Sequence, residues 1–203
     1  FMRFLITGGA GFIGGHLSKN LIDDGHSVVA IDDLSTGRME NLSAFSDDKN
    51  FQLVVESITN TSVMDRLVSE CDIIIHLAAA VGVELIVRSP VDTIETNVMG
   101  TENVLRTARR YRKKILIAST SEIYGKLTNV PFNEDDDSLI GATTHHRWAY
   151  ATSKALDEFL ALAYHKEMGL PVVIFRLFNT IGPRQRGRYG MVVPRFVRQA
   201  LSG

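Results

Sequence analysis

A glycine-rich segment near the N-terminus constrains the fold of this chain more strongly than any other feature. It reads Gly8-Gly9-Ala10-Gly11-Phe12-Ile13-Gly14 and lies between an apolar run at 4–6 and an amphipathic run that ends at Asp24. Gly8 permits a tight turn, Gly11 lets a ligand approach the backbone, and Gly14 lets the following helix pack closely on the strand. Free N–H groups at the start of that helix can donate to phosphate oxygens. The segment therefore predicts a strand–turn–helix unit that binds a dinucleotide.

A second strand pattern, at 27–31, ends immediately before Asp32. An acidic residue about 20 positions after the glycines is where such a unit binds a ribose hydroxyl. Asp32 therefore favours the dinucleotide interpretation over a plain glycine-rich turn, which the glycines alone would support equally well.

Strand and helix patterns alternate along the rest of the chain, which has 203 residues. This alternation predicts an α/β fold, a doubly wound parallel sheet with helices on both faces and ligands at the carboxyl ends of its strands. No linker divides the chain into two domains. The expected strands are 3–7, 27–31, 51–55, 72–77, 115–118 and 172–175, and the expected helices are 11–24, 62–69, 91–110 and 150–167.

Composition narrows the classes of partner. The net charge of −1 indicates neither a nucleic-acid nor a membrane-surface partner, and no apolar stretch reaches the roughly 18 residues of a membrane span. Cys71 is the only cysteine, which excludes an intrachain disulfide and fits a reducing, cytoplasmic location. His145 and His146 are adjacent and point in different directions, so we expect no metal site. His76, at the end of an apolar strand, is expected to be a hydrogen-bonded core residue.

Tyr150 and Lys154 form the second informative pattern. Side chains four positions apart share one face of a helix, so the Lys154 ammonium can approach the Tyr150 phenol and lower its pKa. A phenol with a lowered pKa can act as a base near neutral pH, although this spacing also occurs on ordinary amphipathic helices. The strand at 115–118 ends in Ser119-Thr120-Ser121-Glu122, which brings hydroxyls and a carboxylate to the same sheet edge. A turn or a helix cap would also explain these residues.

Together these patterns resemble the extended short-chain dehydrogenase/reductase family, in its branch of NAD-dependent nucleotide-sugar epimerases, dehydratases and decarboxylases. The resemblance covers essentially the whole chain. The motifs that carry it are Thr7-Gly8-Gly9-Ala10-Gly11-Phe12-Ile13-Gly14, Asp32-Asp33-Leu34, His76-Leu77-Ala78-Ala79, Asn97-Val98-Met99-Gly100-Thr101, Ser119-Thr120-Ser121-Glu122-Ile123-Tyr124-Gly125, Tyr150 with Lys154, and Arg176-Leu177-Phe178-Asn179-Thr180.

The resemblance implies a Rossmann-like NAD-binding domain over 1–203, in which 178–203 begins the nucleotide-sugar-binding region. The family's substrate lobe is completed by a further C-terminal segment, so we expect a truncated lobe here. The family also implies a homodimer formed through the helices 91–110 and 150–167.

The resemblance assigns roles to individual residues. Tyr150 would take the proton of the sugar C4 hydroxyl while NAD⁺ accepts the C4 hydride, which leaves a 4-keto sugar. Lys154 would bind the nicotinamide ribose and tune Tyr150, and Thr120 would hydrogen-bond the same sugar oxygen. Asp32 would bind the adenosine ribose and disfavour NADP, because a 2′-phosphate would meet its carboxylate.

The complete implied site is larger. The catalytic residues would be Thr120, Tyr150, Lys154, Glu122 and Ser121. The cofactor would contact Gly8, Gly11, Phe12, Ile13, Gly14, Asp32, Asp33, Ser57, Ile58, Leu77, Ala78, Ala79, Asn97, Tyr150 and Lys154. The substrate, a UDP-linked sugar, would contact Thr120, Asn179, Arg188 and Val193. Arg184, Arg186 and Arg188 are either cations near the diphosphate or parts of a solvated loop.

Two departures from the family pattern bear on specificity. Where the family commonly has an adenine-binding Asp, this chain has Glu56-Ser57-Ile58, although Ser57 can still accept a hydrogen bond. Ser121 stands where the 4,6-dehydratases carry the Asp of an Asp-Glu pair, which disfavours dehydration.

Several functions therefore remain open. The segment 80–84 resembles UDP-sugar 4-epimerases, which we rank first, whereas Ser121-Glu122 and Arg147-Trp148 resemble UDP-glucuronate decarboxylases, which we rank second. A sugar-nucleotide 4,6-dehydratase is the third alternative. A non-catalytic NAD-binding scaffold or redox sensor is an alternative of a different class.

Overall fold

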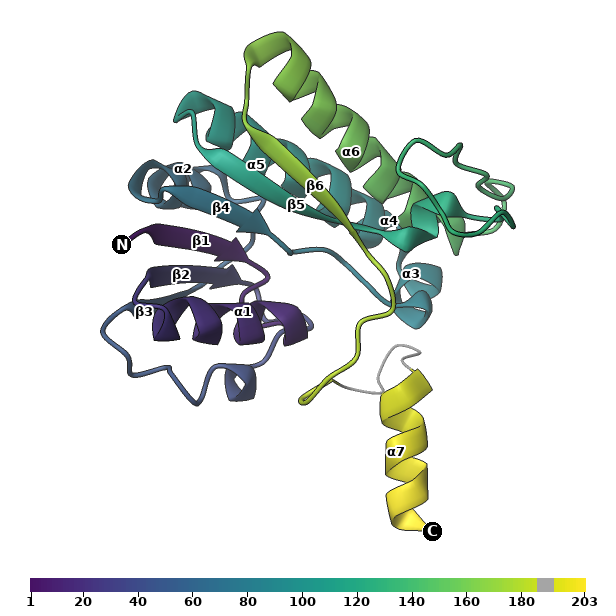
Figure 1. Ribbon diagram of the computed structural model, residues 1–203, viewed down its shortest axis with the longest axis horizontal. Helices are drawn as coiled ribbons and strands as arrows, with labels where there is room; N and C mark the ends of the chain where they lie inside the picture. The colour runs from purple at the N-terminus through teal and green to yellow at the C-terminus, as the bar shows by residue number, and fades with distance from the viewer. Residues whose placement is uncertain (186–191) are drawn as a thin grey trace.

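A six-stranded parallel sheet forms the centre of the computed structural model, which describes residues 1–185 and 192–203 (Figure 1). The strand order is β3-β2-β1-β4-β5-β6, so the chain reverses its direction of winding between β1 and β4. Ligands bind at such a switch point, beyond the carboxyl ends of the strands. The strands are β1 Arg3–Thr7, β2 Ser27–Asp32, β3 Phe51–Val55, β4 Ile73–His76, β5 Lys114–Thr120 and β6 Val172–Leu177.

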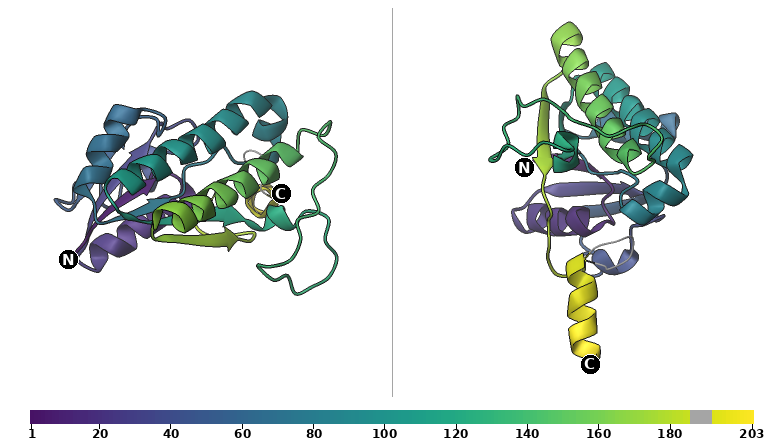
Figure 2. Two further views of the ribbon diagram at one scale, coloured as in Figure 1. Left: turned by 90° about the horizontal axis from the view of Figure 1, so that it is seen from above. Right: turned by 90° about the vertical axis from the view of Figure 1, so that its right-hand side faces the viewer.

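Helices cover both faces of the sheet, as the two side views show (Figure 2). The helices are α1 Phe12–Asp23, α2 Thr61–Glu70, α3 Val83–Arg88, α4 Pro90–Ile94, α5 Gly100–Arg110, α6 Trp148–Met168 and α7 Val192–Ser202. On one face Leu5 and Ile117 pack with buried side chains of α2, α5 and α6, and on the other face Phe4 and Ile6 pack against α1. The prediction of a doubly wound, Rossmann-like sheet is confirmed.

Local sequence signals account for several helix ends. Asn60 caps α2, because its side chain accepts a hydrogen bond from the Val63 N–H at 3.3 Å. Gly169 ends α6 in a left-handed conformation with φ +67°, which glycine adopts without strain. Pro90 begins α4, the position where proline is best tolerated in a helix.

The expected helix 91–110 is present but contains a π-helical turn, η2 Glu95–Met99, between α4 and α5. A π turn adds a residue to one turn of the helix and is frequent at functional sites. The buried side chains Thr93, Asn97 and Thr101 still lie on its inner face, and Asn97 bonds to Ser153 of α6.

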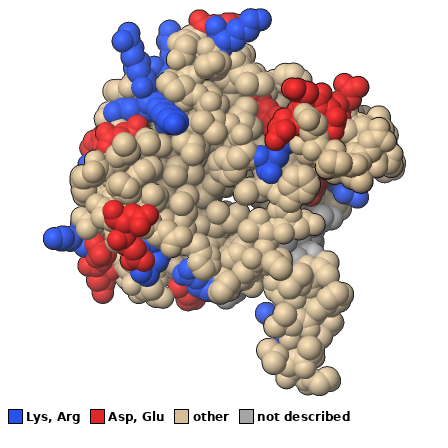
Figure 3. All heavy atoms as spheres, in the orientation of Figure 1, with Lys and Arg blue, Asp and Glu red and all other residues tan. Residues whose placement is uncertain are grey.

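The helices α3 and α7 were not expected from the sequence. Figure 1 shows α7 projecting away from the body of the molecule, and Figure 3 shows mostly uncharged atoms on the visible face of α7. The exposed apolar side chains of α7 are Val192, Val193, Phe196, Val197 and Leu201. None of the helices that the structure describes is both long and apolar enough to cross a membrane.

Candidate active site

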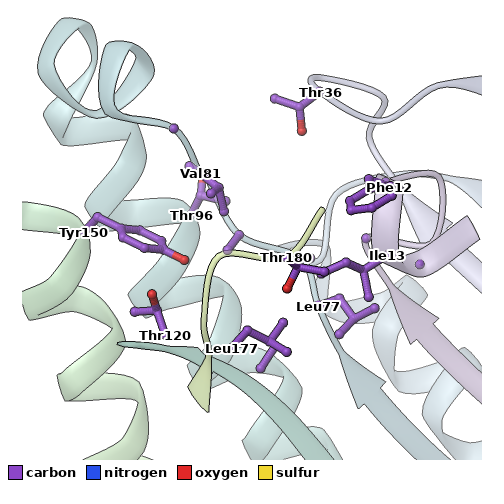
Figure 4. Close-up of a pocket in the computed structure, with 18 of the residues that line it drawn as sticks. Phe12, Ile13, Thr36, Leu77, Val81, Thr96, Thr120, Tyr150, Leu177 and Thr180 are labelled. Carbon is purple, nitrogen blue, oxygen red and sulfur yellow. The ribbon is translucent and has the colours of Figure 1, made fainter. Parts of the chain in front are cut away.

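A cavity of about 750 Å³ lies along the carboxyl edge of the sheet and joins the glycine turn to the start of α6. Figure 4 shows Tyr150 and Thr120 at one end of it and Phe12, Ile13 and Thr36 at the other. The predicted residues that line it are Gly8, Gly11, Phe12, Ile13, Gly14, Asp32, Asp33, Ser57, Ile58, Leu77, Ala78, Ala79, Thr120, Ser121, Glu122, Tyr150, Asn179 and Val193. One cavity therefore unites the two patterns found in the sequence.

The glycine turn is closely packed. Gly8 has φ +69°, and a Cβ added there would lie 2.8 Å from the Ala78 nitrogen. A Cβ at Gly14 would collide with the carbonyl oxygen of Gly8. Helix α1 begins after Gly11 with no side-chain cap and no acidic residue in its first turn, so its first N–H groups remain available to an anion. These features fit the diphosphate of a dinucleotide cofactor.

Asp32 is held in a fixed position at the end of β2. Its Oδ2 accepts a hydrogen bond from the Ala10 N–H and its Oδ1 accepts one from the Leu34 N–H, both at 2.9 Å. Burial raises the pKa of this carboxyl, and the two backbone hydrogen bonds oppose that effect. The nearby Arg38 guanidinium contacts Glu40, at 3.5 Å. The carboxylate in the cavity therefore fits a ribose diol better than a 2′-phosphate.

Tyr150 points its hydroxyl into the cavity toward Thr120 (Figure 4). Thr120 also caps the short 3-10 helix η3 Ser121–Tyr124, because its side chain accepts a hydrogen bond from the Glu122 N–H at 3.2 Å. The helix-cap interpretation of Thr120 is confirmed, and the residue also lines the cavity. η3 carries Ser121 and Glu122 into the cavity lining beside Tyr150.

The pKa values at the Tyr150 end of the cavity differ from the expectation. Burial raises the pKa of Tyr150 to about 12, with a further increase from Glu122 and a smaller opposing effect of the hydrogen bond with Thr120. Burial also raises the pKa of Glu122, and the charge of Arg147 opposes this. The expected lowering of the Tyr150 pKa is therefore wrong.

Lys154 explains that difference. Its Nζ donates to Asp157 Oδ2 at 2.8 Å, the side chain is 2% exposed, and it does not line the cavity. Asp157, three positions along the helix, shares the face of Lys154 just as Tyr150 does, and it carries the opposite charge. The ammonium is therefore neutralised by the carboxylate.

Two further predicted residues, Asn97 and Arg184, do not line the cavity. Asn97 is fully buried, with Oδ1 accepting from the Ala80 N–H and Nδ2 donating to Ser153 Oγ, so it braces the segment that follows β4. Arg184 donates to the Asn41 carbonyl at 2.6 Å and to His16 Nδ1 at 2.9 Å. Arg184 is exposed on its loop, and these contacts tie 181–185 to α1. Arg186 and Arg188 lie outside the described residues.

Sequence reasoning missed other lining residues. Ser35 and Thr36 follow Asp33 in the turn after β2, and their short polar side chains after an acidic pair were a usable signal. Thr96 lies in the π turn, where the 3.6-residue period that guides helix reading does not hold. Within the described part of the chain no cluster of three or more metal-ligating side chains occurs.

A model of the family described as GDP-mannose 4,6 dehydratase matches residues 5–203. The chain belongs to this family. Among curated members, the UDP-N-acetyl-alpha-D-glucosaminuronate decarboxylase of Bacillus cytotoxicus is 46% identical over 202 residues, 99% of this chain and 62% of that protein. UDP-glucuronic acid decarboxylase 1 of Danio rerio is 39% identical over 201 residues, 99% of this chain and 47% of that protein. The chain thus spans about half to two thirds of these relatives.

Solved structures agree with the family assignment. The UDP-N-acetylglucosamine 4-epimerase of Methanobrevibacter ruminantium M1, in complex with UDP-N-acetylmuramic acid, has a TM-score of 0.91 at 31% identity, covering 100% of this chain and 63% of that one. DesIV of Streptomyces venezuelae, a dTDP-glucose 4,6-dehydratase with NAD bound, has a TM-score of 0.90 at 31% identity, with the same coverage. The resemblance to extended short-chain dehydrogenases/reductases and the prediction of NAD as the family's cofactor are confirmed.

Proposed function

We propose that the protein is an NAD-dependent decarboxylase of a UDP-linked uronic acid. The observation that carries the proposal is the group formed by Tyr150, Thr120 and Glu122 at one end of the nucleotide cavity. The identity to two decarboxylases over 99% of the chain supports this reaction over the 4-epimerase that the sequence alone ranked first. Decarboxylation was the second-ranked alternative there.

The reaction begins with oxidation at C4. Tyr150 removes the proton of the C4 hydroxyl while Thr120 holds the same oxygen by a hydrogen bond. NAD⁺, when bound, supplies the hydride acceptor and a positive charge in the same cavity. A nearby positive charge favours the phenolate and so offsets the raised pKa of Tyr150.

The second stage removes carbon dioxide. The 4-ketone lies β to the C6 carboxylate, so the electron pair of the C5–C6 bond moves toward the ketone as the bond breaks. Glu122 then donates a proton to C5, a role that suits a carboxyl whose pKa is raised by burial. Tyr150 then returns its proton to the C4 oxygen as C4 is reduced again, which would give a UDP-pentose.

Ser121 and the N-terminal end of the cavity are consistent with this reaction. Ser121 cannot act as the acid that dehydration requires. Phe12, Ile13 and Asp32 lie at the end where a dinucleotide would be held, and Asn179 and Val193 line the cavity from the segment 178–203. These positions support the proposal that 178–203 begins the nucleotide-sugar region of an NAD-binding domain.

Product analysis tests the proposal. The protein, expressed from its complete reading frame, is incubated separately with UDP-glucuronate, UDP-N-acetylglucosaminuronate and UDP-glucose, and the products are identified by mass spectrometry and NMR. Release of carbon dioxide with a UDP-pentose from one of the uronates is the expected result. A C4 epimer of unchanged mass would instead establish the epimerase. If no sugar is converted, the non-catalytic NAD-binding scaffold is the alternative that remains.

A second proposal concerns assembly as a homodimer. Helix α6 exposes apolar side chains along one face, and the neighbouring helices α4 and η2 do the same. They are Leu156, Phe159 and Leu162 on α6, and Val91, Ile94 and Met99 on α4 and η2. Phe159 is 73% exposed, which is costly for a large aromatic side chain unless a second copy covers it. We expect Phe159→Glu to convert a dimer to a monomer in sedimentation velocity, and a monomeric unmodified protein would contradict the proposal.

A further inference from the structure

A chain of buried polar side chains runs from the nucleotide turn to Lys154. Thr7 Oγ1 lies 2.6 Å from His76 Nδ1, and His76 Nε2 lies 2.9 Å from Thr101 Oγ1. The Thr101 hydroxyl in turn favours the charged form of the Asp157 carboxyl. Lys154 Nζ donates a hydrogen bond to this carboxylate at 2.8 Å. Asp157 Oδ1 has no hydrogen-bond partner among the described residues. None of the five side chains is more than 2% exposed.

The direction of each hydrogen bond follows from the one before it. Thr7 Oγ1 accepts from the backbone N–H groups of Leu77 and Ala78, both at 3.1 Å, so its own proton points to His76 Nδ1. Burial lowers the pKa of His76 to about 3, so the ring is neutral and its single proton is on Nε2. That proton is donated to Thr101, whose hydroxyl favours the ionised form of the Asp157 carboxyl and so lowers its pKa. The expectation that His76 is a hydrogen-bonded core residue is confirmed.

Asp157 thus accepts the hydrogen bond of Lys154, and Thr101 also favours its charged form. Burying an ion pair costs about as much desolvation energy as its attraction returns, so such a pair is weak support for stability alone. The Lys154 ammonium can reach either Asp157 or Tyr150 along the same helix face. The ion pair with Asp157 therefore fixes where this positive charge lies. The Asp157 carboxylate therefore determines whether the Lys154 ammonium lies beside Asp157 or beside Tyr150.

We propose that Asp157 is a positioning residue that holds the Lys154 ammonium behind the cavity wall, and that Thr101 and His76 fix the carboxylate that holds it. The proposal rests on the proposed function, because Lys154 matters to catalysis only if Tyr150 moves the C4 proton. By holding the ammonium, Asp157 limits how much the positive charge of Lys154 can lower the pKa of Tyr150. The chain through Thr7 connects this limit to the turn beside the cofactor.

The charges around Tyr150 and Lys154 are few. Helix η3 presents Glu122, on which the charge of Arg147 acts, α6 presents Asp157 and Glu158, and β4 presents the neutral His76. The inner face of α4, η2 and α5 presents the uncharged side chains Thr93, Asn97 and Thr101. Removal of the Asp157 charge therefore leaves Glu122 as the anion that raises the Tyr150 pKa, and it removes the ion-pair partner of Lys154.

Glu158 offers a matched control. It is adjacent to Asp157 on α6, is also buried, and forms an ion pair with Arg176 at 2.8 Å. Glu158→Gln removes one buried carboxylate and breaks one ion pair, as Asp157→Asn does, but leaves the chain to Lys154 intact.

The test compares Asp157→Asn, Thr101→Val and Glu158→Gln in the protein expressed from its complete reading frame. The first readout is the rate at which Lys154 is acetylated by limiting acetic anhydride, measured by mass spectrometry. We expect a rise of about tenfold in Asp157→Asn, a smaller rise in Thr101→Val and none in Glu158→Gln. The second readout is the pH profile of turnover, whose acidic limb should move about one unit lower in Asp157→Asn, because loss of the anion favours the Tyr150 phenolate.

The outcomes separate the two proposals. Equal acetylation of Lys154 in Asp157→Asn and Glu158→Gln would overturn the positioning role, as would an unmoved acidic limb. If Asp157→Asn does not fold, the nearly isosteric Thr101→Val variant tests the proposal. Acetylation of its Lys154 at the rate of the parent protein would refute the role of the buried polar chain. A selective rise in labelling without any turnover in the parent protein would instead reject the proposed function and keep the positioning role.

Discussion

The two ends of the cavity are built from different parts of the chain. At the nucleotide end the surface is backbone: Gly8, Gly11 and Gly14 leave no room for side chains, and Asp32 is held by two backbone N–H groups. At the other end the surface is side chain, and Tyr150, Glu122 and Lys154 owe their properties to one another and to Asp157. The nucleotide end is therefore sensitive to volume, and the catalytic end is sensitive to charge.

Tyr150→Phe should have the largest effect. The substitution removes one oxygen and keeps the ring, so the cavity keeps its shape while the proton acceptor is lost. We expect turnover to fall about 1000-fold, while NAD affinity changes by less than about threefold. Steady-state kinetics and fluorescence titration with NAD measure the two quantities. Retention of activity would remove the distinction between the two ends and favour the scaffold alternative.

Glu122→Gln should reduce turnover about 100-fold, because the amide cannot supply the C5 proton. It should also shift the acidic limb of the pH profile. Glu122 raises the pKa of Tyr150, so its neutralisation lowers that pKa, and the phenolate forms at lower pH. The pH dependence of product formation checks both effects. A shift of the limb to higher pH would contradict the electrostatic account of this end.

Gly14→Ala tests the volume sensitivity of the nucleotide end. Ala normally stabilises a helix relative to Gly, yet here the added Cβ would collide with the Gly8 carbonyl. We expect a loss of about 2 kcal/mol in the free energy of unfolding and about tenfold weaker NAD binding. Gly25→Ala is the control, because its Cβ would meet open space and its φ of +84° gives only local strain. Similar NAD affinities in the two variants would refute the close-packing argument.

The same contrast explains what the sequence could reveal. Each of the six strands was predicted to within about two residues at each end, because alternating apolar runs and glycine turns depend on backbone periodicity. The five residues of the glycine segment that were predicted to contact the cofactor, Gly8, Gly11, Phe12, Ile13 and Gly14, all line the cavity. The partner of Lys154 was not, because Tyr150 and Asp157 share one helix face and spacing alone cannot choose between them.

Two other features that sequence reasoning missed have a comparable origin. The π turn shifts the register of α4 relative to α5, so a 3.6-residue period could not locate Thr96 at the cavity. Arg184 lies far from its partners in the sequence, and nothing local indicated that His16 and Asn41 would receive its guanidinium. The sequence could not predict which side chains, distant along the chain, the tertiary fold brings into contact.

Substitution of Arg184, which does not itself line the cavity, should give the smallest effect. Its guanidinium spans α1 and the Asn41 carbonyl, and the segment it secures contributes Ile181 and Gln185 to the cavity. A lysine has one ammonium group and cannot reproduce the two-pronged geometry. Arg184→Lys should therefore release NAD about threefold faster in stopped-flow displacement and change the unfolding free energy by less than about 1 kcal/mol. Arg38→Lys, which affects only the exposed contact with Glu40, should leave that rate unchanged, and equal rates in both variants would show that the segment needs no such tie.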